Sequence, residues 1–471
     1  MAKQQLENYW CNSLFLIYLK KHPIVMLFFV LKIYPWALFL RSSPYLLLTA
    51  NVFNKNEVLF YFLNIMYGLC YCKIHLYKFV SNQSPIMKTI FQLLFIIFAS
   101  STFSQTKTDS IASRFLGETR NFSLYIPSNY NKDKERKYPL LILLDGHYLF
   151  DPVVGALKYG NYWDDLPEVI VVGINQNETR ETDCTIDENG VPAAEGIKFF
   201  EFINNELLPF VEKKYRIAPM RIIAGHDLTA TFANLFLYQI NPVFNGYISI
   251  SPEIDNQAQA RIAQFLASFK RPTFYYQAIA DGDLQTTKEA VNVLSEKITK
   301  SQNSNINARK DEFINATHYS VVLHAIPNAL YHMFSAYKPI SNAEYLEKIV
   351  VLEKNHVLYL KQKYEALKND CGIDMKIRFS DFKAIQTAII KNKDYNALDE
   401  LAILARKNYP KSMLADYFLA QQFENKQEDS RALKYYISAF QQEEIGDLSK
   451  TLMMDKADAI KSRLAQAKAG K

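Results

Sequence analysis

The chain between residues 119 and 339 is dominated by continuous apolar runs. Each run ends at a turn-forming residue and is followed by apolar residues at helical spacing. A strand buried on both faces lacks the apolar–polar alternation of a surface strand, and parallel sheets bury both faces beneath helices. Parallel strands also need long crossover connections, which helices supply. The pattern therefore predicts a doubly wound, mostly parallel α/β sheet, with its active crevice at the carboxyl ends of the strands.

The expected strands follow one another with helices between them. They are TRNFSLYIP, KYPLLILLDG, EVIVVGIN, MRIIAG, NGYISISP and RPTFYYQAIAD. Helices are expected over residues 196–215, from about Leu228, and at KEAVNVLSEKI, where apolar residues recur at helical spacing. We expect residues 105–339 to form one α/β domain.

The predicted secondary structure changes near Pro339, because no strand-like run occurs over 341–471 and the apolar residues there recur at helical spacing. Ala405 and Ala439 lie 34 residues apart, which is the period of a tetratricopeptide repeat. Further small and aromatic residues fall at positions typical of that repeat: Pro410, Ala420, Phe423, Ala432 and Tyr436. Residues 340–471 are therefore predicted to be an all-α, tetratricopeptide-like region, which would dock a protein partner.

The net charge of +6 lies entirely in residues 1–86, which hold eight Lys/Arg, two Glu and no Asp. The neutral remainder gives no electrostatic footprint for nucleic acid, so a nucleic-acid partner is not expected. Lys20, Lys21, Lys32 and Arg41 interrupt the apolar stretches of residues 1–86, and few stretches reach the ~18 to 20 residues that a bilayer span needs. We interpret this segment as upstream translated sequence, or else as a membrane-like segment that would make the protein membrane-associated.

Residues 87–104, MKTIFQLLFIIFASSTFS, have the short basic start, apolar core and small residues of a signal peptide. Met87 is thus the expected start, and a mature chain from near Gln105 is expected in the periplasm or outside the cell. Only Cys184 and Cys371 then remain, too few for a disulfide framework and without metal-ligand spacing. No metal and no cofactor are expected.

The sharpest local motif is RIIAGHDLTATFANLF, a buried strand, a tight turn and a helix. A turn of the type G-x-nucleophile-x-G lifts one side chain above the sheet, and here that side chain is Asp227, with Thr229 in place of the last glycine. His318 follows in a polar stretch, NATHYSVV, and ADGDL offers Asp281 and Asp283 as the carboxylate that would orient it. The chain order nucleophile, acid, histidine is complete.

These segments together resemble the putative esterase family, an α/β-hydrolase branch that includes esterase D and the enterochelin esterases. The resemblance covers residues 115–338 and is carried by LLILLDGHYLF, NQNETRETDCT, AGHDLTA, ADGDL and ATHYSVV. It implies an α/β-hydrolase fold, with Asp227 in the nucleophile's place, Asp283 (or Asp281) as the acid and His318 as the base.

The resemblance further implies an oxyanion hole from backbone amides near Gly146 and His147 and at Leu228. Arg180 and Asp183 are additional pocket candidates that would hold an acyl or acidic substrate group, although a surface ion pair is the commoner outcome for such residues.

The main departure from the family is Asp227, because the family's nucleophile is serine. A carboxylate attacks a carbonyl carbon poorly and would form a mixed anhydride, whereas it suits saturated carbon that bears a leaving group. Gly-His-Asp is also similar to the turn of haloalkane dehalogenases and epoxide hydrolases, but those families follow the aspartate with tryptophan, and Leu228 follows here. Asp227 could alternatively serve as a helix cap, since it precedes a helix and tolerates a strained backbone.

Two functions follow from these residues. The first is an exported esterase-like hydrolase acting on a carboxylic ester or related small substrate, with Asp227 as an unusual nucleophile or as a water-activating group. The second is a catalytically inactive α/β-hydrolase-fold binding protein with a helical region for docking a partner.

Overall fold

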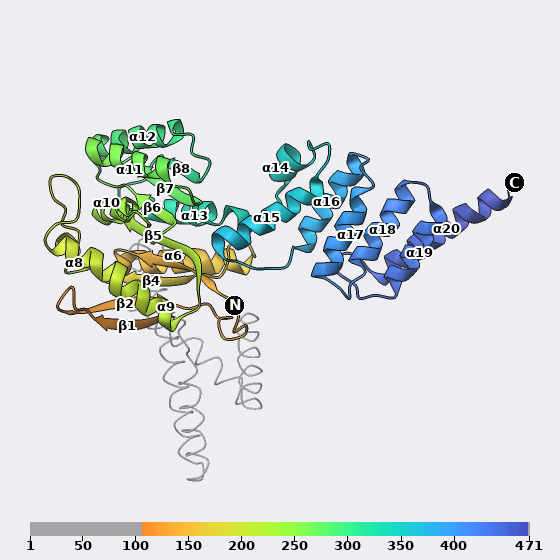
Figure 1. The fold of residues 1–471 in the computed structure, drawn as a ribbon, viewed down its shortest axis with the longest axis horizontal. Coiled ribbons are helices and arrows are strands. Elements are labelled where there is room, and N and C mark those ends of the chain that lie inside the picture. Colours follow the sequence, from red (N-terminus) through yellow and green to blue (C-terminus); the bar gives the residue numbers. More distant parts are fainter. Residues whose placement is uncertain (1–105, 470–471) are drawn as a thin grey trace, which may run out of the picture. The chain divides into compact units, whose positions relative to one another are not determined.

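The computed structural model describes residues 106–469, and within them an eight-stranded sheet is followed by helices (Figure 1). The segments 1–86 and 87–104, predicted to be upstream or membrane-like sequence and a signal peptide, lie outside the described residues. Among the residues that are described, no helix is long and apolar enough to cross a membrane.

The sheet has the order β1-β2-β4-β3-β5-β6-β7-β8. The first two strands run antiparallel to their neighbours, and the pairs from β4 to β8 are all parallel. The strands are β1 (Thr106–Ala112), β2 (Thr119–Tyr125), β3 (Tyr138–Leu143), β4 (Ile170–Ile174), β5 (Ile217–His226), β6 (Gly246–Ile250), β7 (Thr273–Ala280) and β8 (Ile306–Phe313). The predicted doubly wound, mostly parallel sheet is confirmed.

The helices of the sheet region connect these strands. They are α6 (Gly146–Tyr162), α7 (Arg180–Asp183), α8 (Glu195–Glu201), α9 (Leu208–Lys214), α10 (Leu228–Ala233), α11 (Asn256–Ser268), α12 (Gln285–Lys300) and α13 (Val321–Met333). The helix expected over 196–215 is present, but a π-helical turn over Phe202–Leu207 separates α8 from α9. Two short 3-10 segments, Asn234–Tyr238 and Ser335–Tyr337, follow α10 and α13.

Alternate residues of the central strands face opposite layers of the core. In β3, Leu140 and Ile142 pack with the cluster that includes α8, α9, α11 and α12, whereas Leu141 and Leu143 pack with the cluster that includes α6 and α13. Every residue of β3, β4, β6 and β7 is buried, as a strand covered by helices on both faces requires. The apolar runs seen in the sequence are these strands.

The edge strands β1 and β8 were not predicted. Their sequences, TKTDSIA and INARKDEF, are largely polar, and the side chains of β8 are exposed or half-buried. A strand at a sheet edge buries little apolar surface, so it carries none of the hydrophobic signal that marks the central strands.

After Tyr337 the chain is helical: α14 (Asn342–Glu344), a π-helical turn (Tyr345–Ile349), α15 (His356–Cys371), α16 (Phe379–Lys391), α17 (Ala397–Asn408), α18 (Leu414–Asn425), α19 (Asp429–Phe440) and α20 (Lys450–Ala469). Ala405 and Ala439, the two residues 34 positions apart, are both fully buried. Consecutive helices from α17 to α20 pack on one another around a third apolar core. The predicted all-α region is confirmed; its exact boundary at 339/340 stays a prediction.

Helix α15 belongs to two of these cores. Val357 and Leu360 pack into the core of the helical region, while Leu367 and Cys371 pack into the sheet-side cluster of α6 and α13. Arg378 adds a polar connection, because its Nε lies 2.7 Å from Asp164 Oδ2 at the end of α6. Apolar packing and an ion pair thus join the helices to the α/β layers.

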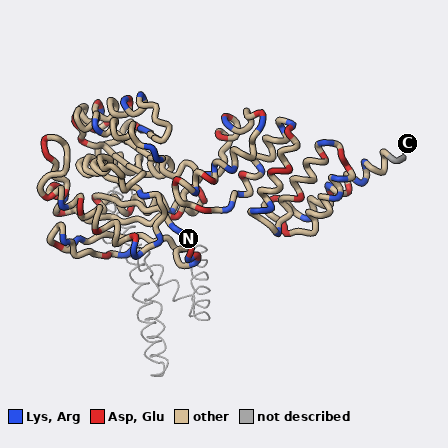
Figure 2. Tube along the Cα trace, in the orientation of Figure 1, with Lys and Arg blue, Asp and Glu red and all other residues tan. Residues whose placement is uncertain are grey.

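Positive and negative side chains alternate along the described trace, with no long segment of one sign (Figure 2). This distribution agrees with the neutral composition of residues 87–471.

Gly146 allows α6 to begin against the middle of the sheet. A Cβ at this position would lie 2.2 Å from the carbonyl carbon of Gly173 in β4. We expect Gly146→Ala to destabilise the protein by about 3 kcal/mol or more, because backbone must shift to admit the methyl group. Gly155→Ala in the same helix is the matched control: nothing lies within 4 Å, so it should stabilise by up to ~1 kcal/mol. Urea unfolding of both variants measures the difference, and equal effects would contradict the close packing.

His356 makes the stability of the protein sensitive to acid. Its side chain is buried, Nε2 lies 3.0 Å from Asn392 Nδ2, and Nδ1 has no hydrogen-bond partner among the described residues. Burial lowers the pKa of His356 below its ordinary 6.5, so the unfolded chain binds the proton more readily than the folded one. This stabilisation is complete above pH 6.5 and is lost as the pH falls towards the folded pKa, at no more than about 1.4 kcal/mol per pH unit.

We therefore expect His356→Gln to flatten the loss of unfolding free energy between pH 6.5 and 5. Urea titrations across this pH range measure the slope for both proteins. Burial also lowers the pKa of His226 and His332, so the variant should retain part of the acid sensitivity. Identical slopes for the two proteins would show that His356 does not contribute to the acid sensitivity of the unfolding free energy.

Candidate active site

The turn between β5 and α10 holds Asp227 in a strained backbone conformation, with φ 59° and ψ −124°. The tightness of the turn comes from Gly225, where a Cβ would lie 2.5 Å from the carbonyl carbon of Thr229. A residue other than glycine in this region costs about 1–3 kcal/mol, and such strain persists where the surroundings impose it, often at functional sites. The strand-turn-helix predicted from the sequence is present.

The Asp227 carboxylate makes no capping hydrogen bond to α10. One oxygen, Oδ2, accepts a hydrogen bond from Arg180 Nη2 at 3.1 Å. The other, Oδ1, lies 3.9 Å from His318 Nε2. The helix-cap role that the sequence left open for Asp227 is therefore not the arrangement found.

His318 follows β8 in the loop that precedes α13, and its ring is fixed by Asp283. Nδ1 lies 2.7 Å from Asp283 Oδ1. The other oxygen of Asp283 accepts hydrogen bonds from Ser251 Oγ and the Ala280 amide, both at 2.6 Å. Because a carboxylate accepts, we assign the ring proton to Nδ1, which leaves the Nε2 lone pair facing Asp227.

The two aspartates of ADGDL lie in different surroundings. The Asp283 side chain is completely buried against His318, whereas Asp281 is exposed, and its hydrogen bonds are those of its backbone to Phe313 and Lys288. The structure thus brings Asp283, and not Asp281, to the histidine. The side chains of a turn have no fixed periodicity, so the spacing of the two aspartates in the sequence does not distinguish them.

Backbone amides at two helix starts lie at the same edge of the sheet. Gly146 and His147 begin α6 directly after β3, and Leu228 begins α10 directly after β5, which pairs with β3. The first amides of a helix have no acceptor within it, and they form the positive end of its dipole. These amides are suited to stabilise a developing oxyanion, as the resemblance implied.

Arg180 and Asp183, the two pocket candidates of α7, separate in the structure. Arg180 contacts Asp227 and also Asp145, with Nε 3.0 Å from Asp145 Oδ1. Asp183 instead accepts hydrogen bonds from Arg120 and Thr179 and is buried. Asp183 is therefore not placed beside Asp227 as a pocket residue: its carboxylate forms a buried ion pair with Arg120 of β2, instead of a surface pair.

Several residues of the site were missed by the sequence reasoning. Asp145 has no exposed surface and accepts hydrogen bonds from Tyr148 Oη and Thr229 Oγ1, both at 2.8 Å, besides those from Arg180. His226 contacts the loop of the site histidine, because its Nε2 lies 2.9 Å from the backbone oxygen of His318. The sequence signal for Asp145 was only the Asp-Gly pair after a buried strand, which is equally the signal of an ordinary turn.

Burial and the carboxylate of Asp145 shift the pKa values of this network. Burial opposes the charge of Arg180, but Asp145, Asp227 and Tyr148 together outweigh it, so the pKa of the guanidinium is raised. Burial, and then the nearby Asp145, raise the pKa of Tyr148. Burial, and then the nearby His318, lower the pKa of His226. At neutral pH the network therefore holds a charged arginine, a neutral tyrosine and a neutral His226.

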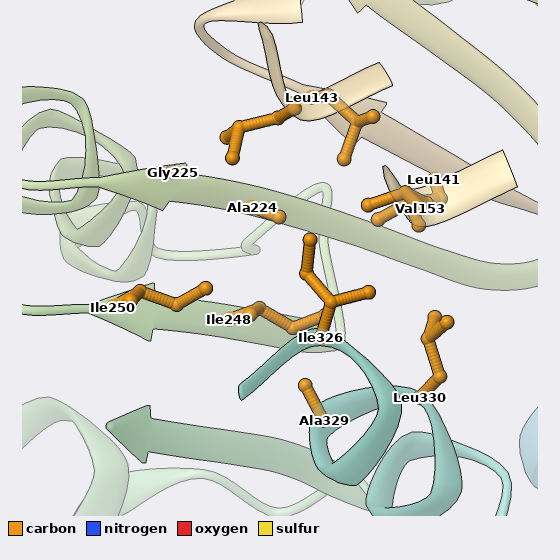
Figure 3. A pocket seen from close by; sticks show the side chains of 11 residues that line it. Leu141, Leu143, Val153, Ala224, Gly225, Ile248, Ile250, Ile326, Ala329 and Leu330 are labelled. Atoms are coloured by element: carbon orange, nitrogen blue, oxygen red, sulfur yellow. The ribbon is translucent and has the colours of Figure 1, made fainter. Parts of the chain in front are cut away.

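A small cavity lies inside the core and not at this site (Figure 3). Its volume is about 10 Å³, which is at the lower limit for one water molecule. Aliphatic side chains from β3, β5, β6, α6 and α13 line it, such as Leu141, Ile248 and Ile326. The cavity offers no polar anchor for a ligand, and we regard it as a packing space. Among the described residues, no group of three or more His, Cys, Asp or Glu is placed to hold a metal ion.

Comparisons with known proteins agree with this geometry. The family model described as putative esterase matches residues 113–315. The crystal structure of an uncharacterised protein from Capnocytophaga ochracea is 26% identical and has a TM-score of 0.67, over 76% of this chain and 100% of that chain. None of the curated proteins compared with the chain matches it.

Two further solved structures are more distant. The IroE-like serine hydrolase from Shewanella oneidensis is 19% identical, with a TM-score of 0.48 over 66% of this chain and 99% of that one. The enterobactin esterase FES from Shigella flexneri is 14% identical, with a TM-score of 0.39 over 49% of this chain and 60% of that one. The mostly parallel α/β sheet and the strand-turn-helix at Asp227 agree with the family match: residues 113–315 of the chain resemble the putative esterase family.

Proposed function

We propose that this protein hydrolyses a carboxylic ester, or a related small substrate, by activating a water molecule between Asp227 and His318. The observation that carries the proposal is the separation of 3.9 Å between Asp227 Oδ1 and His318 Nε2. This is too long for a direct hydrogen bond, but one water can donate a hydrogen to each of these two acceptors. Its lone pairs would then be free to attack.

The chemistry uses the remaining groups of the site. His318 Nε2 takes a proton from the water as its oxygen bonds to the ester carbonyl carbon, and Asp283 stabilises the imidazolium that forms. The amides of Gly146, His147 and Leu228 would receive the oxyanion. When the tetrahedral intermediate collapses, the C–O bond to the alcohol breaks and His318 returns the proton to the leaving oxygen. The products are an acid and an alcohol.

Arg180 supports water, and not Asp227, as the attacking group. Its guanidinium lies 3.1 Å from Asp227 Oδ2 and withdraws charge from a carboxylate that is already a weak attacker at carbonyl carbon. The same ion pair keeps the carboxylate in place to hold a water molecule.

We expect the chain from residue 105 to hydrolyse 4-nitrophenyl acetate, and His318→Ala to lower kcat/KM by about 10²–10⁴-fold, because the general base is lost. Asp283→Asn should also lower it strongly, while Asp281→Asn, the matched control in the same turn, should not. Initial rates at pH 7 to 8 measure these effects. Equal rates for the natural protein and His318→Ala would show that His318 is not the general base and would contradict the proposed site.

Isotope labelling tests whether water that enters the reaction leaves its oxygen in Asp227. In a single turnover in H₂¹⁸O, mass spectrometry should find the label in the released acid and not in Asp227. Label in Asp227 would instead assign it as the nucleophile. Asp227→Ser should form an acyl-enzyme that the natural protein does not form, because serine can attack directly.

The second candidate function is ligand binding without turnover, and the Asp227–Arg180 ion pair also favours it, since each charge already has a partner. A silent natural protein whose Asp227→Ser variant is active would support this function. The helical region over 340–471 would then serve, as a tetratricopeptide-like surface, to dock a protein partner. The 34-residue spacing of Ala405 and Ala439 supports that part of the proposal.

We also propose that the protein is exported to the periplasm or the outside of the cell and that the α/β domain spans 105–339. The basic start, apolar core and small residues of 87–104 support export. N-terminal sequencing of the protein from its own cells should find a start near Gln105. A start within residues 1–86 and recovery in the membrane fraction would contradict export and indicate a membrane anchor.

A further inference from the structure

Both departures of the turn from the family's usual sequence, Asp227 and Thr229, contact one buried ion pair. Arg180 Nη2 donates to Asp227 Oδ2 at 3.1 Å, and Thr229 Oγ1 donates to Asp145 Oδ2 at 2.8 Å. Arg180 Nε joins the two by lying 3.0 and 3.1 Å from the Asp145 oxygens. The substitutions at the turn are therefore linked through Asp145 and Arg180.

Asp145 holds Arg180 in a fixed position. A carboxylate with no exposed surface destabilises the fold unless it is paired, and removal of one partner of such a pair is strongly destabilising. Tyr148 Oη and Thr229 Oγ1 both donate to Asp145 Oδ2, and the backbone N–H of Asp145 donates to Gln176 Oε1 at 3.0 Å. Asp145 and its partners form a rigid support below the site.

Arg180 is also tied to the end of β5. Its Nη2 donates to the backbone oxygen of His226 at 3.1 Å, so the same nitrogen touches the strand and the Asp227 carboxylate. Its Nη1 lies 3.7 Å from Glu181, which is largely exposed. The guanidinium is thus held by buried acceptors at Nε and Nη2. We infer that its fixed position sets the orientation of the Asp227 carboxylate.

We propose that Arg180, anchored by Asp145, is a positioning residue that orients Asp227 so that its Oδ1 faces His318 Nε2. With Oδ2 paired to the guanidinium, Oδ1 is the oxygen left to hold a water molecule beside the histidine. This inference rests on the proposed function for its effect on catalysis. The orientation itself is a property of the folded protein with or without turnover.

The first test removes the guanidinium and returns it in solution. Arg180→Ala should lower kcat for 4-nitrophenyl acetate at least tenfold, with KM changed less than twofold, because a small neutral ester has no charge for Arg180 to bind. Guanidinium chloride at tens of millimolar should restore part of kcat. Arg309→Ala is the matched control, since it removes an Arg–Asp pair at 2.9 Å on β8 and should leave kcat unchanged.

A purely structural role gives a different result. In that case Arg180→Ala would lose activity in proportion to its loss of melting temperature, and guanidinium would not restore it. Should Arg180→Ala fail to fold because Asp145 is left unpaired, the double variant Asp145→Asn/Arg180→Ala removes both charges. It should fold and show the same loss of kcat; full activity in the folded double variant would overturn the proposal.

A second readout separates this inference from the proposed function. In ¹⁵N-labelled full chain, the His318 Nε2 resonance should move in Arg180→Ala and in Asp227→Asn, and return towards its original position in the first variant on addition of guanidinium. A resonance that Arg180→Ala leaves in place would overturn the positioning role. If the resonance moves as expected but no variant hydrolyses esters, the proposed function fails and the positioning role stands.

Discussion

The buried carboxylate of Asp145 is the constraint on which the site depends. It lies just beyond β3, a strand with no exposed residue, in a place where an unpaired charge would destabilise the fold. Arg180 from α7, Tyr148 from α6 and Thr229 from α10 each supply a hydrogen bond to it. One charge therefore fixes three separate elements relative to the central strand, and two of these elements begin with the amides of the candidate oxyanion hole.

The parallel sheet explains why residues far apart in sequence meet here. Asp145, Asp227 and Asp283 follow β3, β5 and β7, and the carboxyl ends of parallel strands share one edge of the sheet. His318 completes the group from the loop after β8, at the end of the sheet. Two contacts hold His318 beside the turn. Its Nδ1 lies against the Asp283 carboxylate, and its backbone oxygen lies against His226 Nε2.

The helical region is connected to this layer through α6. At the far end of that helix from the site, Arg378 pairs with Asp164, while Tyr337 Oη donates to the other Asp164 oxygen at 2.6 Å. The aliphatic residues of α15 add apolar contacts to the same side of the sheet. Both ends of α6 are thus held by polar contacts, one end by the Asp145 network and the other by Tyr337 and Arg378 at Asp164.

The sequence alone determined the order of buried strands and helices, the turn at Asp227, the chain order of the site residues and the all-helical character after Pro339. These features depend on local periodicity and turn chemistry, which neighbouring residues carry themselves. The edge strands β1 and β8 could not be predicted from the sequence, because a partly exposed strand has no continuous apolar run. The tertiary structure alone decided that Asp283 and not Asp281 meets His318, that Asp183 is buried against Arg120, and that Asp145 pairs with Arg180. Each of these outcomes depends on side chains from distant segments meeting in a low-dielectric interior, where every charge needs a partner and only the assembled fold supplies it.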